Sequence, residues 1–413
     1  MKLVDPADVA TILKTETQRQ RFCVAYSGGL DSVVLLHSLV EIKKQHPAWS
    51  VRALHVHHGL NPRADAWQLH CEQVCHALGI PIQTLKIQCV VSPGESLEAV
   101  AREQRYAALF GHVHIDEVLV TAHHADDQAE TLLLQLLRGA GVAGLAAMPR
   151  SRWESDRLLI RPLLSYSRAS LEAYAQDQQL TWVEDDSNAN IAFDRNYLRH
   201  EVMPKLRARW PALATNLQRS SQHCASALEA IRAQAQMDLR QARVSSHVLC
   251  FDVFSNWRLQ RQVECVREWF RDCGLSVPSD AQLKKIFHEM IDARPDASPH
   301  LSFGSVSLRR YRRCLYLLDA TRPREHDSKV FKITWQKGQG LSYTPELGCY
   351  QWRFGLGGEK LKKIFQTAGI PPWERATQPL LFFNDTLIAV ADYWVNTDYL
   401  VKAECLGFRL VNV

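Results

Sequence analysis

The chain has 413 residues, of which 46% are hydrophobic and 23% charged, and its formal net charge is +5. This length predicts two or three domains, each with enough apolar material for a core. The eleven cysteines are scattered and include no Cys-x-x-Cys pair, which suits reduced thiols better than a disulfide framework. No apolar stretch reaches membrane-spanning length, so no membrane span is expected. Because no apolar leader precedes the first polar residues, we expect a cytoplasmic protein with reduced thiols.

The first half of the chain alternates strand-like and helix-like segments. An apolar run of strand length, 22–26, ends in Ser-Gly-Gly, and an apolar segment of helical character follows it. This alternation predicts βαβ units and an α/β fold with a doubly wound, mostly parallel sheet. The further expected strands are 51–56, 81–87, 117–122 and 158–164, and the expected helices are 33–42, 66–78, 96–110 and 128–137.

The second half is organised differently. A long, polar helical pattern covers 204–242, and residues 247–320 are expected to form a small, mainly helical domain that closes with a strand-like segment at 306–318. After a polar linker at 321–329, aromatic-rich alternating runs and one helix near 360–367 indicate a C-terminal α+β domain. The expected domains are therefore 1–215, 216–322 and 329–413.

The turn after the first expected strand has the composition of a phosphate-binding loop. Gly28 and Gly29 allow an anion to approach the backbone, and the N-terminus of the next helix presents unpaired N–H groups. Ser27 and Ser32 add hydroxyl donors. Asp31 would repel phosphates unless a cation lay between, so it predicts Mg²⁺ held jointly by protein and nucleotide. The loop is neither a Walker loop nor a dinucleotide fingerprint.

A second group of functional side chains follows the fourth expected strand, at 123–131. Ligands of parallel sheets bind beyond the carboxyl ends of the strands, where both this segment and the glycine loop are expected. Asp126 and Asp127 begin a helix, where its dipole stabilises carboxylates, and they could hold Mg²⁺ or orient an amine. Helix capping is the alternative. A zinc site with the nearby histidines is a further alternative, although their spacing is not a standard ligand pattern.

The glycine loop resembles the Ser-Gly-Gly-x-Asp-Ser loop of the PP-loop ATP pyrophosphatases, which cleave ATP between its α and β phosphates. Together with the 123–131 segment it resembles the bacterial tRNA(Ile)-lysidine synthetases. Further blocks at 161–164, 185–204 and 357–390 extend the resemblance over nearly the whole chain. In one place the chain departs from the pattern, because it lacks the arginine-bearing insert that many members carry before Leu361. The acceptor-end contacts of that insert are therefore not expected here.

The resemblance implies that ATP adenylates O2 of the cytidine at the first anticodon position of a CAU-bearing isoleucine tRNA. Free L-lysine then attacks C2 with its ε-amine, AMP leaves, and the lysidine formed changes codon recognition from AUG to AUA. An ammonium is no nucleophile, so the site must deprotonate or desolvate the lysine amine. The roles implied are ATP binding for Ser27, Gly28, Gly29, Leu30, Asp31 and Ser32; Mg²⁺ binding for Asp31 and Asp126; and catalysis for Asp31, His124, Asp126, Asp127, Glu130 and Arg195.

RNA binding calls for basic side chains, which supply salt-dependent phosphate affinity, and for aromatic rings on which an extruded base stacks. The candidates are Arg199, Lys360, Lys362, Lys363 and Trp373, with a further basic cluster at 309–313. A solvated surface is the alternative for each of these clusters. Family members also suggest a homodimer.

Three other functions compete with the ligase. A PP-loop tRNA cytidine thiolase would need Cys-x-x-Cys or cluster-binding cysteines, which the chain does not place suitably. A non-catalytic tRNA-binding protein would not need Asp31, Asp126, Asp127 and Glu130 together. A metal-dependent hydrolase is the third alternative.

Overall fold

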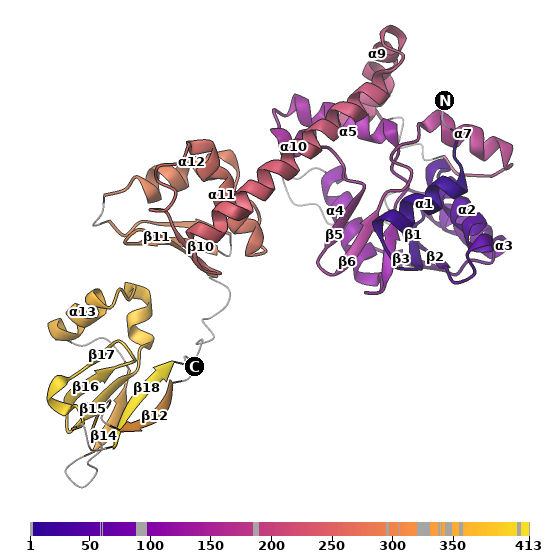
Figure 1. The fold of residues 1–413 in the computed structure, drawn as a ribbon. Coiled ribbons are helices and arrows are strands. Elements are labelled where there is room, and N and C mark those ends of the chain that lie inside the picture. The colour runs from indigo at the N-terminus through magenta and orange to yellow at the C-terminus, as the bar shows by residue number, and fades with distance from the viewer. Residues whose placement is uncertain are drawn as a thin grey trace. The chain divides into compact units, whose positions relative to one another are not determined.

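A computed structural model of the chain describes residues 3–412, apart from residues 58, 60, 88–96, 185–189, 295–296, 305, 320–330, 338, 340, 343–348, 355–357 and 403–405. The chain divides into two compact units, residues 1–231 and 232–413 (Figure 1). The division into three domains expected from the sequence remains a proposal. Among the described helices, none is long and apolar enough to cross a membrane.

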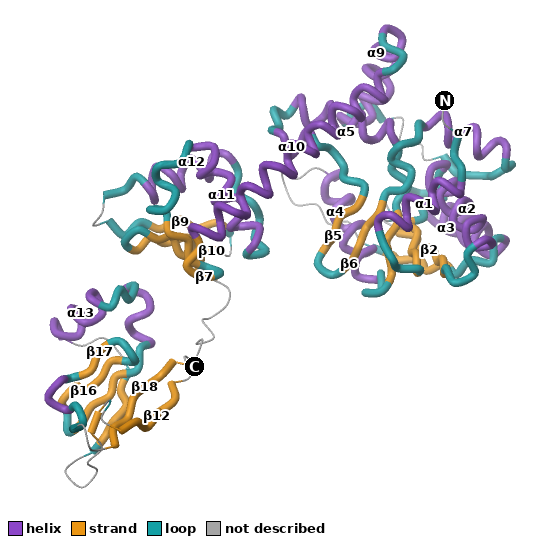
Figure 2. The backbone as a smooth tube through the Cα atoms, in the orientation of Figure 1, coloured by secondary structure: helices purple, strands orange, loops and turns teal. Residues whose placement is uncertain are grey.

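The first unit is built on a six-stranded sheet in the order β3-β2-β1-β4-β6-β5. Figure 2 shows strands of this sheet in orange, with helices in purple around them. The first five of these strands run parallel, and β5 pairs with β6 in the antiparallel sense. The doubly wound, mostly parallel sheet is therefore confirmed. Its strands are β1 (Arg21–Ala25), β2 (Ser50–His57), β3 (Ile82–Lys86), β4 (Glu117–Val120), β5 (Ser151–Glu154) and β6 (Arg157–Ile160).

Alternate residues of the strands face opposite sides of this sheet. Phe22 and Val24 pack in a core with α1, α2, α3 and α7, whereas Cys23 packs on the other side with Leu109 and Phe110 of α4. Both faces are thus covered by helices. Neither α1 nor β5 was expected from the sequence. The helices are α1 (Pro6–Glu16), α2 (Leu30–Gln45), α3 (Ala64–Ala77), α4 (Leu97–His112), α5 (Ala125–Leu137), α6 (Val142–Leu145) and α7 (Arg168–Asp177).

The strand order places the two expected motifs side by side. Strand β1 pairs with β2 on one side and with β4 on the other. The chain therefore adds β2 and β3 on one side of β1 and then continues with β4 on the opposite side. The glycine loop follows β1, and the 123–131 segment follows β4. This is the topological switch point, where open α/β sheets bind their ligands.

The unit continues in helices beyond the sheet. A π-helical turn, η2 (Leu198–Val202), lies between α8 (Asp194–Tyr197) and α9 (Met203–Arg209), and π-helical turns are frequent at functional sites. The long helix α10 (Leu213–Ala242) then runs across the boundary between the units. The helical pattern expected over 204–242 is therefore two helices.

The middle segment of the chain contains more strand than the sequence analysis expected. Helices α11 (Leu259–Asp272) and α12 (Asp280–Lys285) and the π-helical turn η3 (Ile286–Ile291) pack on a five-stranded antiparallel sheet in the order β7-β8-β11-β10-β9. The single strand expected at 306–318 is a hairpin. The strands are β7 (Arg243–Ser245), β8 (Val248–Cys250), β9 (His300–Phe303), β10 (Val306–Tyr311) and β11 (Cys314–Asp319).

The C-terminal segment has the expected α+β character. It carries one three-stranded sheet, β12-β18-β13, and one four-stranded sheet, β14-β15-β16-β17. The linker expected at 321–329 lies outside the described residues. The elements are β12 (Phe331–Lys337), β13 (Leu341–Ser342), β14 (Tyr350–Arg353), α13 (Gly358–Thr367), η5 (Pro372–Thr377), β15 (Leu380–Phe383), β16 (Thr386–Val390), β17 (Trp394–Val395), η6 (Thr397–Tyr399) and β18 (Leu406–Asn412).

Candidate active site

The glycine loop is held in a fixed shape by its own serines. The Ser27 and Ser32 hydroxyls lie 3.1 Å apart, and the Ser32 hydroxyl also donates to the Gly29 carbonyl at 2.9 Å. Gly28 has a φ of +82°, and a Cβ atom there would lie 2.7 Å from the Cys71 Sγ of α3. Only glycine fits this position without strain or a clash.

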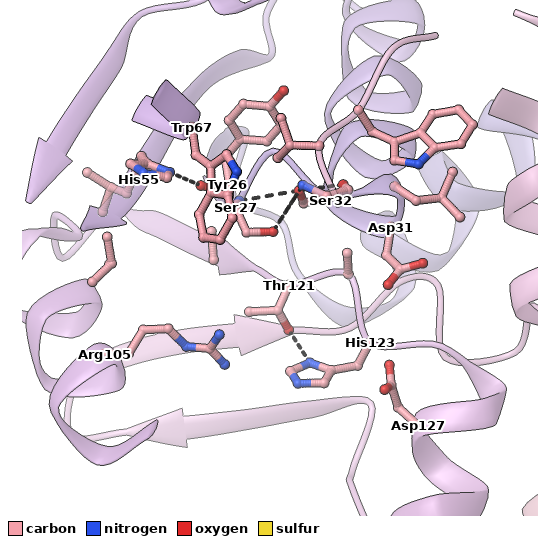
Figure 3. Close-up of a pocket in the computed structure, with 18 of the residues that line it drawn as sticks. Tyr26, Ser27, Asp31, Ser32, His55, Trp67, Arg105, Thr121, His123 and Asp127 are labelled. Atoms are coloured by element: carbon pink, nitrogen blue, oxygen red, sulfur yellow. Dashed lines mark hydrogen bonds between the residues drawn. The ribbon is translucent and has the colours of Figure 1, made fainter. Parts of the chain in front are cut away.

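The loop borders a cavity of about 640 Å³ at the switch point (Figure 3). Asp31 enters from the first turn of α2, Thr121 and His123 follow β4, and Asp127 comes from the first turn of α5. Tertiary structure thus brings both expected motifs to one cavity. Arg199 of η2 lines the same cavity.

His124 caps the N-terminus of α5 and links it to the glycine loop. Its Nδ1 accepts the Asp126 backbone N–H at 3.3 Å, and its own backbone N–H donates to Asp127 Oδ2 at 3.0 Å. Its Nε2 lies 3.6 Å from Asp31 Oδ2. Burial alone would lower the pKa of His124, but the carboxylates of Asp127, Asp31 and Asp126 raise it above its ordinary value.

Two arginines neutralise the buried carboxylates of α5. Arg195 donates to Asp127 Oδ1 at 2.8 Å and to Glu130 Oε2 at 2.9 Å. Arg199 donates to both Glu130 oxygens, at 2.7 and 2.8 Å. Burial raises the pKa of Asp127, but the charges of His124 and Arg195 hold it well below its usual range. The Asp127 carboxylate is therefore ionised at neutral pH.

Asp126 has different partners, although it is adjacent to Asp127 in the sequence. Its Oδ2 accepts the backbone N–H of Arg168, the first residue of α7, at 2.7 Å. Its Oδ1 accepts from the guanidinium of Arg207 in α9. Asp126 therefore ties three helices together, and it is not among the residues that line the cavity.

A magnesium ion fits Asp31 better than it fits Asp126. The Oδ1 atom of Asp31 is buried without a hydrogen-bond partner among the described residues, and hard cations prefer such carboxylate oxygens. Both oxygens of Asp126 already accept hydrogen bonds from Arg168 and Arg207. In the described part of the chain, no cluster of three or more His, Cys, Asp and Glu residues could hold a metal by itself, so Asp31 would share the ion with a ligand.

Sequence reasoning missed Arg105 of the cavity wall, and it placed His123 near the site without giving it a role. Arg105 lies on α4 and faces the cavity, and no described carboxylate forms an ion pair with it. His123 exchanges a hydrogen bond with Thr121 at 2.9 Å, and burial holds its pKa well below the ordinary value, so the ring is neutral. The arginine gave no signal in the sequence, because a helical arginine is most often solvated.

The RNA-binding candidates of the C-terminal segment differ in exposure. Lys362 and Lys363 are exposed on α13. Lys360 is exposed as well, with its ammonium 5.4 Å from the Trp394 ring. Trp373 is half-buried, and its ring packs edge-on against Tyr316 at a centroid distance of 5.3 Å.

Part of the sequence pattern that supported the family lies outside the described residues. Residues 185–189, which include the Asp-Asp-Ser-Asn block, and Gly357 are in these gaps. The arginines of the same region, Arg195 and Arg199, are described and contact the site directly.

Comparison with known proteins identifies the family. A model of the PP-loop domain matches residues 4–206, one of the TilS substrate binding domain matches 249–316, and one of the TilS substrate C-terminal domain matches 343–411. The tRNA(Ile)-lysidine synthase of Coxiella burnetii is 38% identical over 98% of this chain and 96% of its own length. The chain belongs to the tRNA(Ile)-lysidine synthase family.

Other members of the family align at a similar level. The enzyme of Serratia proteamaculans is 39% identical over 90% of this chain and 91% of its own length, and that of Vibrio cholerae is 36% identical over 92% of each. Among solved structures, the U34-tRNA thiolase NcsA from Methanococcus maripaludis is 17% identical, with a TM-score of 0.43 over 53% of this chain and 77% of that one. The full-length relatives decide the family.

Proposed function

We propose that this protein converts the cytidine at the first anticodon position of a CAU-bearing isoleucine tRNA to lysidine. ATP adenylates the cytosine O2 and releases pyrophosphate, and free L-lysine then replaces the adenylated oxygen and releases AMP. The observation that carries the proposal is that the glycine loop lines one cavity together with His123 and Asp127. Family membership supports the choice of substrate.

The first step needs a site that holds a triphosphate and turns a poor leaving group into a good one. The glycine loop and the N-terminus of α2 offer backbone N–H groups to the phosphates. Asp31, with its unsatisfied Oδ1, would hold Mg²⁺, which would neutralise phosphate charge. Arg105, a cavity-facing cation without a described carboxylate partner, would stabilise negative charge on the opposite wall.

The second step needs lysine's amine in its neutral form. Asp127 and Glu130 would attract the ammonium group of lysine, in competition with Arg195 and Arg199, which pair with these carboxylates here. His123 is neutral and faces the cavity, where it would accept the proton that the nitrogen loses once it has attacked C2. His124, whose pKa is raised, would serve better to position Asp31 and Asp127.

The RNA partner would be held by residues beyond the cavity. Arg199 lines the cavity, and the exposed Lys360, Lys362 and Lys363 of α13 would supply phosphate contacts. Trp373 would contribute less by base stacking than the sequence suggested, because its ring already packs against Tyr316. A homodimer and the role of Asp126 in metal binding remain predictions.

The proposal is tested by incorporation of labelled lysine into unmodified CAU isoleucine tRNA with ATP and Mg²⁺. Initiator methionine tRNA, which shares the anticodon, is the control RNA, and an Asp31→Ala variant is the control enzyme. Incorporation into the isoleucine tRNA alone, absent in the variant, supports the ligase. Pyrophosphate release without lysine incorporation would point to another nucleophile. The absence of both pyrophosphate release and lysine incorporation would favour a non-catalytic RNA-binding protein.

The thiolase alternative would need a reactive sulfur at the cavity, and no cysteine of the described residues lines it. Cys71, which underlies the loop, is fully buried, and burial raises its pKa to about 12. A buried thiol of this kind is inert as a nucleophile at neutral pH.

A further inference from the structure

Cys250 and Cys314 lie opposite one another in the sheet of the middle segment, far along the chain from the residues of the active site. Cys250 is the last residue of β8 and Cys314 the first residue of β11, and the antiparallel register pairs them directly. Both are free thiols and half-buried. Neither has a role in the proposed reaction.

The hydrogen bonds around the pair show which kind of position it occupies. The Phe251 backbone N–H donates to the Arg313 carbonyl at 3.0 Å, so the next pair along the ladder is a hydrogen-bonded one. Hydrogen-bonded and non-hydrogen-bonded pairs alternate in antiparallel sheets, which makes Cys250 and Cys314 a non-hydrogen-bonded pair. At such positions Cα atoms are about 4.5 Å apart, within the range of about 4.4–6.8 Å that disulfides span.

Neighbouring contacts keep the two strand ends in this register. Arg313 Nε lies 3.0 Å from Asp252 Oδ1, so an ion pair bridges the strands immediately beyond the cysteines. On its other side Cys314 pairs with Tyr311 across the β10–β11 hairpin. Burial, together with the neighbouring Cys250 thiol, raises the pKa of Cys314 to about 12, which slows attack by the Cys314 thiol on an external disulfide and leaves the first attack to Cys250.

We propose that Cys250 and Cys314 form a redox modification site that closes to a cross-strand disulfide under a disulfide oxidant such as oxidised glutathione. The Cys250 thiolate attacks oxidised glutathione, forming a mixed disulfide and releasing one glutathione thiolate. The second cysteine, after losing its proton, attacks the mixed disulfide and releases the second glutathione. The two cysteines lose two electrons and two protons, and one oxidised glutathione becomes two reduced ones.

The bridge would tie together nearly the whole middle segment. It would join β8 to β11 and enclose α11, α12, η3, β9 and β10 in one covalent loop. A cross-link that closes a long loop stabilises a fold chiefly by restricting the unfolded chain. Disulfides that form in reducing compartments are usually transient and redox-sensing, which is the behaviour expected here.

The test treats the full-length protein with oxidised glutathione, quenches it with an alkylating agent and maps the peptides by mass spectrometry. We expect a cross-linked Cys250–Cys314 peptide that dithiothreitol removes, and none in the Cys314→Ser variant. Cys71 and Cys75 are the matched control within the chain, since they are both fully buried on α3 and should stay reduced. The proposal is overturned if both thiols stay reduced, or carry only separate glutathiones, when a surface dithiol peptide in the same buffer is fully oxidised.

A second measurement distinguishes the bridge from chance oxidation. The oxidised protein should unfold at a higher temperature than the reduced protein, and the Cys250→Ser and Cys314→Ser variants should show no such difference. An equal midpoint in the oxidised and reduced protein, with the cross-link present, would contradict the stabilising role.

Discussion

His124 Nε2 lies 3.6 Å from Asp31 Oδ2, which joins the helix that follows the glycine loop to the helix that follows β4. The same nitrogen lies 3.4 Å from Asp127 Oδ2. Because Nδ1 accepts a backbone N–H, the neutral ring carries its proton on Nε2, facing the two carboxylates. The two motifs therefore form one electrostatic unit.

This arrangement predicts a pH dependence of stability. The folded pKa of His124 is raised above the unfolded value of about 6.5. Its protonation therefore stabilises the fold below about pH 6.5, and this contribution is lost as the pH rises through the folded pKa. When the pH is raised from 6 to 8, the free energy of unfolding measured by urea denaturation should fall less for a His124→Gln variant than for the parent. Parallel pH curves for the two proteins would contradict the raised pKa.

Asp31 should be essential for the adenylation step. An Asp31→Ala variant removes the carboxylate that we propose for Mg²⁺, and we expect pyrophosphate release to fall by at least about 100-fold. Asp65 is the matched control, because it too lies in the first turn of a helix after a parallel strand but is largely exposed. Asp65→Ala should stay within about twofold of the parent. Equal losses in both variants would remove Asp31 from the mechanism.

Gly28 should not tolerate a side chain. Gly28→Ala combines a φ of +82° with a Cβ only 2.7 Å from Cys71 Sγ, so both backbone strain and a clash result. Gly79 has a φ of +64° with nothing within 4 Å of a Cβ, so Gly79→Ala isolates the strain, which costs about 1–2 kcal/mol. Urea denaturation should show the larger loss for Gly28→Ala, with weakened ATP binding. Similar losses would show that the clash relaxes.

Arg195 and Arg199 should act together on stability. Each single alanine variant leaves one arginine on Glu130, so we expect losses of about 1–3 kcal/mol each. The double variant leaves the buried Glu130 carboxylate without an arginine partner and Asp127 with only His124, and it should lose more than the sum of the two. Arg138→Ala, which breaks the exposed pair with Asp194, is the control and should cost under about 0.5 kcal/mol. Simple additivity would mean that the two arginines stabilise the site independently.

Charge reversal on α13 should weaken RNA binding alone. Lys362→Glu with Lys363→Glu should lower tRNA affinity by about tenfold or more and reduce its salt dependence, because two phosphate contacts are lost. ATP binding, which belongs to the first unit, should not change. The exposed Lys284 and Lys285 of α12 are the control pair. Equal losses from both pairs in a salt titration would indicate general charge attraction and no defined contact.

Local physics made the glycine loop predictable. A buried strand, two glycines and a helix N-terminus within a few residues require no distant contact to form a phosphate site, so Ser27–Ser32 could be identified as such. The parallel sheet was predictable for a similar reason, since its strands are continuous apolar runs between helices. The short β5 and the hairpin strands of the middle segment were not, because such strands depend on pairing with distant partners.

Asp126 and Asp127 show where sequence reasoning ends. Both are acidic residues in the first turn of one helix, and both received catalytic roles from the sequence. Arg168 and Arg207 donate to the two oxygens of Asp126, which does not line the cavity, while Asp127 does. The sequence by itself determined the fold class, the phosphate loop and the family, because these depend on local patterns. Only tertiary structure decided three other features: which carboxylate faces the cavity, the position of Arg105 in the cavity wall, and the pairing of Cys250 with Cys314. Each of these depends on helices and strands that lie far apart in the chain.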